Sequence, residues 1–345
     1  MGAGKWDTGA YTRAADARRA AGAHDFGYDA TMRSVPRNRR RAAPALDPYG
    51  VTVREARDSD EHPASTPIAI LFDVTGSMGQ VPLTLQRRLP DLLGLLRRGR
   101  YAEDPQVMVG AVGDDQYDTV PLQVGQFESD NRIDEQLRDV YIEGGGGGDR
   151  CEGYALAAYF LATRAELDAV DRRGRKGYVF LIGDEANKPR LLAESVRRFT
   201  GDDLDEDLDV ASVYRQLQER FHVFFVVPNL TSYYGAPWLE AHWRPIVGER
   251  FLQLDDPDAV CELIALTVGV TEQSVTLDEG LADLADLAPA GGAAGGATGG
   301  AAAGAAVGKA LAGLRTGRGD VRTTATVSGS VAARWSTVAP FASSP

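Results

Sequence analysis

The fold is decided by ten residues, Ile68-Ala69-Ile70-Leu71-Phe72-Asp73-Val74-Thr75-Gly76-Ser77. The first five are apolar and rich in β-branched and aromatic side chains, which favours a buried β-strand. The next five place a carboxylate, Asp73, and two hydroxyls, Thr75 and Ser77, at alternate positions of the turn that leaves this strand. Three oxygen ligands at the mouth of a sheet suit a hard divalent cation. The stretch therefore predicts both a core strand and a metal site.

Outward from this stretch, strand-like and helix-like patterns alternate. Apolar runs of strand length cover 67–72, 106–112, 177–182 and 221–227, and amphipathic stretches cover 81–98, 151–168, 189–199, 209–220 and 257–268. This order predicts a Rossmann-like α/β domain, with a mostly parallel central sheet and helices on both faces. Ligands of such sheets bind at the carboxyl ends of the strands, where Asp73 is expected. The 115–130 region is expected to form an antiparallel edge.

Composition bounds the class of protein. The 345 residues, 43% of them apolar, are enough for a sizeable core, and no run of eighteen apolar residues predicts a membrane span. The first residues lack the apolar run of a secretion signal, so we expect a cytoplasmic protein. Cys151 and Cys261 fall inside predicted helices and are expected to be reduced thiols. The net charge of -12 argues against nonspecific nucleic-acid binding by the core.

Shifts in composition divide the chain into four parts. We expect a basic, partly disordered N-terminal arm over 1–62, an α/β domain over 63–272, an acidic and then Ala/Gly-rich flexible linker over 273–314, and a C-terminal tail over 315–345 that is a candidate docking segment. Residues 1–57 hold eleven Lys or Arg against six Asp or Glu. Such an arm either folds back on the acidic body or docks on a partner or nucleic acid, and the sequence leaves both open.

Two more carboxylates are predicted to join the opening turn. Asp149 follows a run of five glycines, which lets the backbone approach a ligand closely, and Asp184 follows the strand at 177–182. Because the carboxyl ends of parallel strands meet at one edge of a sheet, Asp73, Asp149 and Asp184 should converge around Thr75 and Ser77.

With these residues in order, the chain resembles a von Willebrand factor type A domain with a metal-ion-dependent adhesion site, of the intracellular bacterial type. The family's motif residues are matched by Asp73, Thr75, Ser77, Asp149 and Asp184. The glycine-rich loop of the family usually ends in Thr. Asp149 stands at that place, as in a subset whose Gly-Gly-Gly-Asp loop is followed closely by Glu, here Glu152. The resemblance covers residues 65–270.

This resemblance implies a function without catalysis. Those five residues would hold Mg²⁺, with Mn²⁺ or Ca²⁺ as alternatives, and leave one coordination position for an Asp or Glu of a protein partner. Intracellular members often serve as adaptors or assembly factors, beside AAA-type ATPases or in regulatory complexes. Asp149 in place of Thr adds a third carboxylate, so we expect tighter metal binding and weaker recruitment of a partner's carboxylate.

An enzyme is the alternative from the same residues. Phe72 to Ser77 also resembles the nucleophile turn of haloacid-dehalogenase-type phosphotransferases, with Asp73 as the nucleophile, and 183–187 resembles their second acidic motif. The glycine loop has a role only in the adhesion site, and the core offers only Lys176 and Lys188 for the lysine of a phosphotransferase. A binding module is therefore favoured over a Mg²⁺-dependent phosphatase, and a scaffold with a degenerate site is a third alternative.

Overall fold

The computed structural model describes residues 5–23, 26–98, 100–286 and 300–314, so the predicted tail over 315–345 lies outside the described residues. The helices are α1 Thr8–Ala20, α2 Gly27–Arg33, α3 Val81–Arg98, α4 Arg132–Arg138, α5 Tyr154–Arg164, α6 Asp168–Asp171, α7 Ala193–Thr200, α8 Val210–Arg220, α9 Pro237–Val247, α10 Val260–Thr271, α11 Leu277–Asp286 and α12 Gly300–Leu311. The strands are β1 Arg54–Ala56, β2 Thr66–Asp73, β3 Pro105–Val112, β4 Leu122–Val124, β5 Cys151–Glu152, β6 Ala165–Leu167, β7 Gly177–Ile182, β8 Ala186–Asn187, β9 Arg190–Leu191, β10 Leu208–Asp209, β11 Phe221–Pro228 and β12 Phe251–Leu254.

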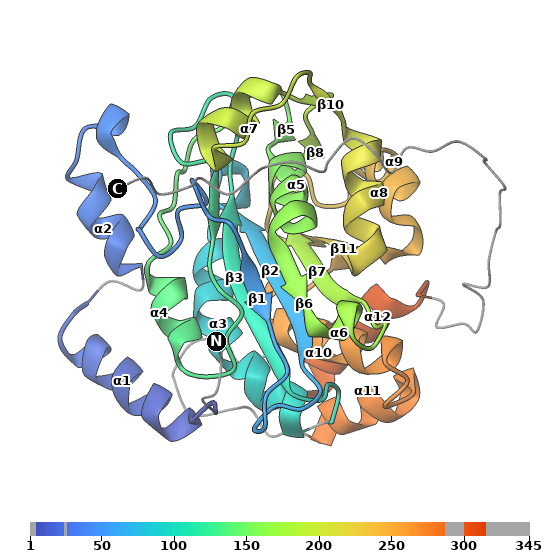
Figure 1. Cartoon of the computed structure of the whole chain (residues 1–345). Helices are drawn as coiled ribbons and strands as arrows, with labels where there is room; N and C mark the ends of the chain where they lie inside the picture. The colour runs from blue at the N-terminus through green and yellow to red at the C-terminus, as the bar shows by residue number, and fades with distance from the viewer. Residues whose placement is uncertain (1–4, 24–25, 99, 287–299, 315–345) are drawn as a thin grey trace, which may run out of the picture. The chain divides into compact units, whose positions relative to one another are not determined.

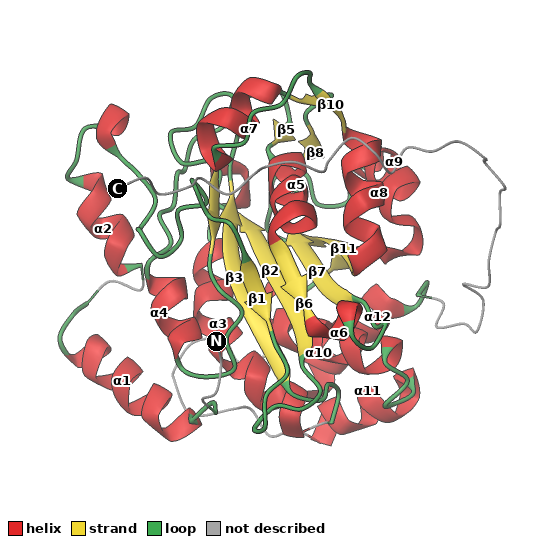
Figure 2. Cartoon of the chain, viewed as in Figure 1, coloured by secondary structure: helices red, strands yellow, loops and turns green. Residues whose placement is uncertain are grey.

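Within the described residues, a six-stranded sheet has the order β12-β11-β7-β2-β3-β4. Figure 2 shows its strands β11, β7, β2 and β3 side by side. All neighbouring strands are parallel except β4, which runs antiparallel to β3. The opening strand β2 lies between β3 and β7, so that Phe72 is level with Ala111 on one side and Ile182 on the other. The predicted mixed α/β class is confirmed, and the antiparallel edge expected within 115–130 is β4.

Side chains of β2 alternate between two cores, one on each face of the sheet. Ile68, Ile70 and Phe72 join a cluster formed with α3 and α10, whereas Ala69 and Leu71 join a cluster formed with α5 and α8. Figure 1 shows these helices on both sides of the sheet. All eight residues of β2 are buried, which explains why its sequence is a continuous apolar run rather than an alternating one.

Several boundaries differ from the sequence prediction. The pattern did not reveal β12 or α9. The helix predicted from 151 begins at Tyr154 instead, because Cys151 and Glu152 form β5 and pair with Ala186 and Asn187 of β8. Cys151 is therefore in a strand rather than a helix, while Cys261 is in α10 as predicted, and both are free thiols.

The predicted flexible linker over 273–314 is wrong where α11 and α12 form. These helices pack on α10 and on each other, and Leu284, Val307 and Leu311 are buried in the main core. The N-terminal arm also folds back on the body, because Phe26 and Leu46 are buried in that core. None of the described helices is long and apolar enough to cross a membrane.

Candidate metal centre

The candidate centre lies at the carboxyl edge of the sheet, where the chain order reverses. Asp73 is the last residue of β2, and Asp184 comes two residues after β7. From β2 the chain goes to β3 on one side and later returns to β7 on the other. Strand ends diverge at such a switch point and leave room for a ligand, which brings Asp73 and Asp184 to one place.

Four of the predicted residues come together through hydrogen bonds to the two carboxylates and a close contact between the two hydroxyls. The amide and hydroxyl of Thr75 both donate to Asp73 Oδ1, at 2.7 and 2.5 Å. Thr75 Oγ1 and Ser77 Oγ are 3.2 Å apart, and Ser77 Oγ donates to Asp184 Oδ1 at 2.7 Å. The oxygen atoms of Asp73, Thr75, Ser77 and Asp184 are thus in one cluster, although they come from two strand ends.

Two aromatic residues that the sequence reasoning missed hold the outer oxygens of this cluster. The Tyr154 hydroxyl donates to Asp73 Oδ2 at 2.7 Å, and the Tyr233 amide donates to Asp184 Oδ2 at 3.1 Å. Tyr154 is fully buried at the start of α5. A buried phenol needs a polar partner, which is the only signal in the sequence that could have suggested Tyr154.

The glycine loop forms the wall of the centre through its backbone. The Gly144 amide donates to the Val74 carbonyl at 2.9 Å, and the Gly76 amide donates to the Gly145 carbonyl at 3.0 Å. Gly146 has φ of 135°, a conformation that L side chains rarely adopt. The loop therefore lies beside the Asp73 turn, as predicted, but it contributes backbone rather than a carboxylate.

Asp149 is the predicted ligand that the structure places elsewhere. Its side chain is 46% exposed and pairs with Lys188, whose Nζ is 2.9 Å from Asp149 Oδ2 and 2.7 Å from the buried Asp114 Oδ2. Burial lowers the pKa of the Lys188 ammonium, but its hydrogen bonds to the two carboxylates outweigh this and raise it overall. The ammonium thus neutralises Asp149 at the outer end of the loop.

Glu152, not Asp149, is the third carboxyl group beside Asp73. A Cβ atom on Gly146 would lie 3.5 Å from Glu152 Oε1 and 4.0 Å from Thr75 Cβ, so Glu152 approaches the loop from the side of Thr75. Its side chain is buried, and Oε2 has no hydrogen-bond partner among the described residues. Burial and the charge of Asp73 raise the pKa of Glu152 far above its usual range.

The electrostatics of this cluster fit a cation. Burial raises the pKa of Asp73 to about 7, although hydrogen bonds from Thr75 and Tyr154 oppose the shift, and burial also raises the pKa of Asp184. Burial and the charge of Asp184 raise the pKa of Glu185 to about 7. No Lys or Arg among the described residues forms an ion pair with these carboxylates. A divalent ion would supply the missing positive charge.

The donor set narrows the kind of metal that fits. Two hydroxyl and two carboxylate donors, all oxygen, suit Mg²⁺, which takes few protein carboxylates and keeps waters. No group of three or more His, Cys, Asp or Glu side chains in the described part of the chain is arranged to hold a metal ion. The described residues therefore do not form a metal site from carboxylates alone. A metal ion in this centre would need the hydroxyls of Thr75 and Ser77 as ligands.

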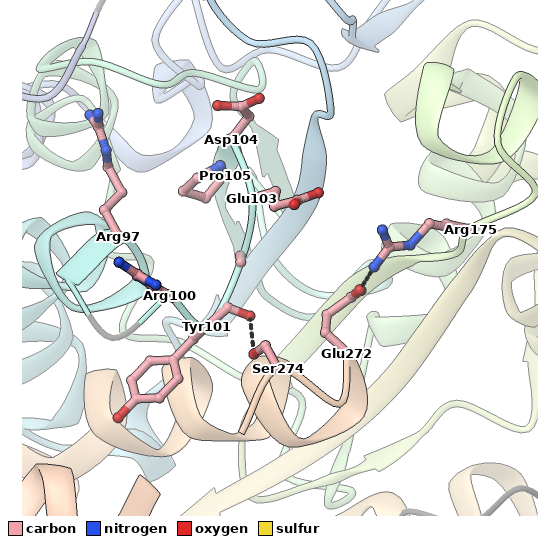
Figure 3. A pocket seen from close by; sticks show the side chains of 10 residues that line it. Arg97, Arg100, Tyr101, Glu103, Asp104, Pro105, Arg175, Glu272 and Ser274 are labelled. Atoms are coloured by element: carbon pink, nitrogen blue, oxygen red, sulfur yellow. Dashed lines mark hydrogen bonds and ion pairs between the residues drawn. The ribbon is translucent and has the colours of Figure 1, made fainter. Parts of the chain in front are cut away.

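A separate cavity of about 410 Å³ lies at the opposite edge of the sheet, where β3 begins (Figure 3). Its lining includes Arg97, Arg100, Asp104 and an ion pair between Arg175 and Glu272. It shares no residue with the cluster of Asp73, Thr75, Ser77 and Asp184.

Comparison with known proteins gives only distant structural similarity. No family model and no curated protein matches the chain. The pilus adhesin SpaC of Lactobacillus rhamnosus GG aligns over 60% of this chain and 30% of its own, with 9% identity and a TM-score of 0.44. Proximal thread matrix protein 1 of the mussel byssus aligns over 59% and 47%, with 11% identity and a TM-score of 0.39. A von Willebrand factor type A protein of Catenulispora acidiphila aligns over 60% and 42%, with 15% identity and a TM-score of 0.35. The chain thus spans less than half the length of each.

Proposed function

We propose that this chain is a metal-dependent protein-interaction module of the von Willebrand factor A type. Asp73, Thr75, Ser77 and Asp184 would hold Mg²⁺, with Mn²⁺ or Ca²⁺ as alternatives, and an Asp or Glu of a partner protein would complete the coordination. The cluster of Asp73, Thr75, Ser77 and Asp184 oxygens is the observation that supports this most, because it gathers the hydroxyl and carboxylate oxygens of the motif at one edge of the sheet.

When bound, the metal would supply positive charge that attracts a carboxylate. The protein's own residues orient the site: Tyr154 and Tyr233 hold the outer oxygens of Asp73 and Asp184, and the glycine loop fixes the Asp73 turn. By family resemblance, the partner is proposed to be an AAA-type ATPase or a member of a regulatory complex. The proposal keeps the cytoplasmic location expected from the sequence.

The phosphotransferase alternative finds less support. Both core lysines are engaged away from Asp73: Lys188 binds Asp114 and Asp149, and Lys176 donates to the Gln218 carbonyl. Trapping of an aspartyl phosphate mimic with beryllium fluoride would support the enzyme and contradict the binding module.

Metal binding can be measured directly by the loss of the free Mn²⁺ signal in electron paramagnetic resonance, with Mg²⁺ as competitor. We expect Asp73→Asn, Ser77→Ala and Asp184→Asn each to weaken Mn²⁺ binding by at least about tenfold, because the asparagines remove a negative charge from the site and the alanine removes a donor oxygen.

Asp149→Asn is the matched control for this measurement. Asp149 is paired with Lys188, so the variant should retain metal affinity to within about threefold of the wild type. Equal affinities in the wild type and Asp73→Asn would contradict the metal site. A loss in Asp149→Asn as large as that in Asp184→Asn would restore the ligand set predicted from the sequence.

A further inference from the structure

The rim of the proposed metal centre carries a guanidinium whose hydrogen-bond donors have no partner in the described part of the chain. Arg150 ends the glycine loop, with its side chain exposed to solvent. Its Cζ lies 5.6 Å from the ring centre of Tyr233 and 5.7 Å from that of Trp238. Among the described residues, no carboxylate pairs with it. Its neighbour Asp149 is engaged by Lys188 instead.

The aromatic platform beneath Arg150 is fixed. The Tyr233 and Trp238 rings meet edge to face at 5.2 Å between centres, and both pack against the core cluster on the α5 face of the sheet. A guanidinium held over an aromatic ring by cation–π attraction does not use its N–H donors for that contact, so they stay available to a carboxylate. Arg150 is therefore arranged to bind an anion.

The backbone at Arg150 is held in an unusual conformation. Its φ is 61°, in the left-handed region that non-glycine residues seldom adopt, and its carbonyl accepts a hydrogen bond from Ala186 at 3.1 Å. The bond ties Arg150 to the segment that follows Asp184. A strained residue that is held in place at a site often has a role there.

The same tyrosine connects the platform to the metal centre. The Tyr233 amide donates to Asp184 Oδ2 at 3.1 Å, and its ring supports Arg150. The next residue back, Ser232, binds the Ser77 carbonyl through its amide and hydroxyl at 3.1 and 3.2 Å. Tyr233 thus contacts both Arg150 and a carboxylate of the centre, which places the two on neighbouring parts of the surface.

We infer that Arg150, whose guanidinium lies over the Tyr233 and Trp238 rings, is a second carboxylate-binding site beside the metal, and that the partner presents two acidic residues a few positions apart in an extended segment. One carboxylate completes the metal coordination and the other pairs with the N–H edge of Arg150. This inference rests on the proposed function and adds the second acidic residue to it.

A random 12-residue peptide library displayed on phage tests the inference, with selection against the full chain in Mg²⁺ or in chelator. The wild type should enrich, in Mg²⁺ only, peptides with two acidic residues within about six positions of each other. Selection against Arg150→Ala should enrich peptides that need only one acidic residue for binding. Arg97→Ala removes an exposed arginine at the opposite edge of the sheet and should select like the wild type.

A selected peptide then allows a double-mutant cycle by fluorescence anisotropy. Changing its second acidic residue to the amide should weaken wild-type binding by about tenfold and leave binding to Arg150→Ala unchanged. Arg150→Lys keeps the charge but not the planar fork of N–H donors, and should show an intermediate effect.

The outcomes separate the two ideas. The role of Arg150 would be overturned if the wild type selected peptides that need only one acidic residue. It would also be overturned if changing the second acidic residue to the amide weakened binding to the wild type and to Arg150→Ala equally. Either result would leave the metal site standing. Enrichment that is the same with chelator, or in Asp73→Ala, would overturn the proposed function and this inference with it. Melting curves of the two arginine variants that match the wild type show that altered binding is local.

Discussion

A Cβ atom on Gly183 would lie 2.0 Å from the hydroxyl oxygen of Tyr154. That hydroxyl donates to Asp73, and the Tyr154 ring cannot move aside freely, because it packs edge to face against Phe225 and Trp243 at 5.3 and 5.5 Å between ring centres. At the scale of single residues, Gly183 is thus required for the hydrogen bond that orients Asp73.

We expect Gly183→Ala to displace the Tyr154 hydroxyl and to lower the free energy of unfolding by about 1–3 kcal/mol, the usual cost of overpacking. The change should also weaken Mn²⁺ binding, because Asp73 loses a donor that holds its outer oxygen. Urea denaturation and the paramagnetic resonance titration measure the two effects.

The double variant Gly183→Ala/Tyr154→Phe is the control for this clash. Removing the hydroxyl gives the new methyl group room, so the double variant should unfold at higher urea than Gly183→Ala alone. Losses that simply add would show that the alanine acts through another contact.

At the scale of elements, α12 is made of a sequence with low intrinsic complexity but is packed as part of the core. Its residues Gly300–Leu311 are mostly Ala and Gly, and glycine lowers helix propensity. The small residues allow close packing: a Cβ atom on Gly308 would lie 3.2 Å from the Leu281 side chain of α11. Burial of Val307 and Leu311 then stabilises a helix that its composition alone would not.

Leu311→Ala should therefore lower the free energy of unfolding by about 2–5 kcal/mol, as expected for a leucine that is 1% exposed. The same substitution at Leu230, which is 76% exposed, should cost less than about 0.5 kcal/mol. Urea denaturation of both variants measures the difference, and equal values would mean that α12 is not part of the folded core in solution.

At the scale of the whole molecule, charge joins distant parts of the chain. The basic N-terminal segment pairs with the acidic body through Arg18 and Asp134 at 2.8 Å, and through Arg37, which lies 3.5 Å from Asp118 and 3.6 Å from Glu143. Of the two interpretations that the sequence left open for this segment, folding back on the body agrees with these contacts. The exposed side chain of Arg37 still limits what each of its pairs contributes to stability.

The stability of the whole chain should depend on pH through His242. Burial lowers the pKa of His242, whose Nε2 accepts a hydrogen bond from the Asn187 amide at 3.1 Å and must be unprotonated to do so. The unfolded chain therefore binds more protons than the folded chain below about pH 6.5. This contribution to stability is present above that pH and is lost as the pH falls through the unfolded value toward the folded one.

His242→Gln keeps an acceptor for the Asn187 amide but removes this titration. As the pH falls from 7.5 to 5, the wild type should lose stability relative to the variant. The free energy of unfolding of the wild type minus that of the variant, measured by urea denaturation, should therefore decrease. A difference that stays constant over this range would contradict the prediction. Taking the difference removes the shared contribution of the buried carboxylates.

Local pattern was sufficient to predict the sheet except for β12, and four of the five residues predicted for the centre. Continuous apolar runs identify strands such as β2 and β7, because strands covered on both faces must be apolar throughout. The spacing Asp73, Thr75, Ser77 also carries its own geometry, since all three lie on one turn at a strand end. Asp184 could be placed with them because parallel strands end at the same edge.

Only the tertiary structure decided which other side chains surround that turn. Asp149 and Glu152 are both near the glycine loop in sequence, and nothing local distinguishes them. The ammonium of Lys188, delivered by a different segment, holds Asp149 outside, while the pairing of β5 with β8 buries Glu152. The packing of α12 was likewise invisible in its composition. The physical reason is the same in each case: burial and charge pairing depend on segments far apart in the chain, and a local pattern reports only on the segment that contains it.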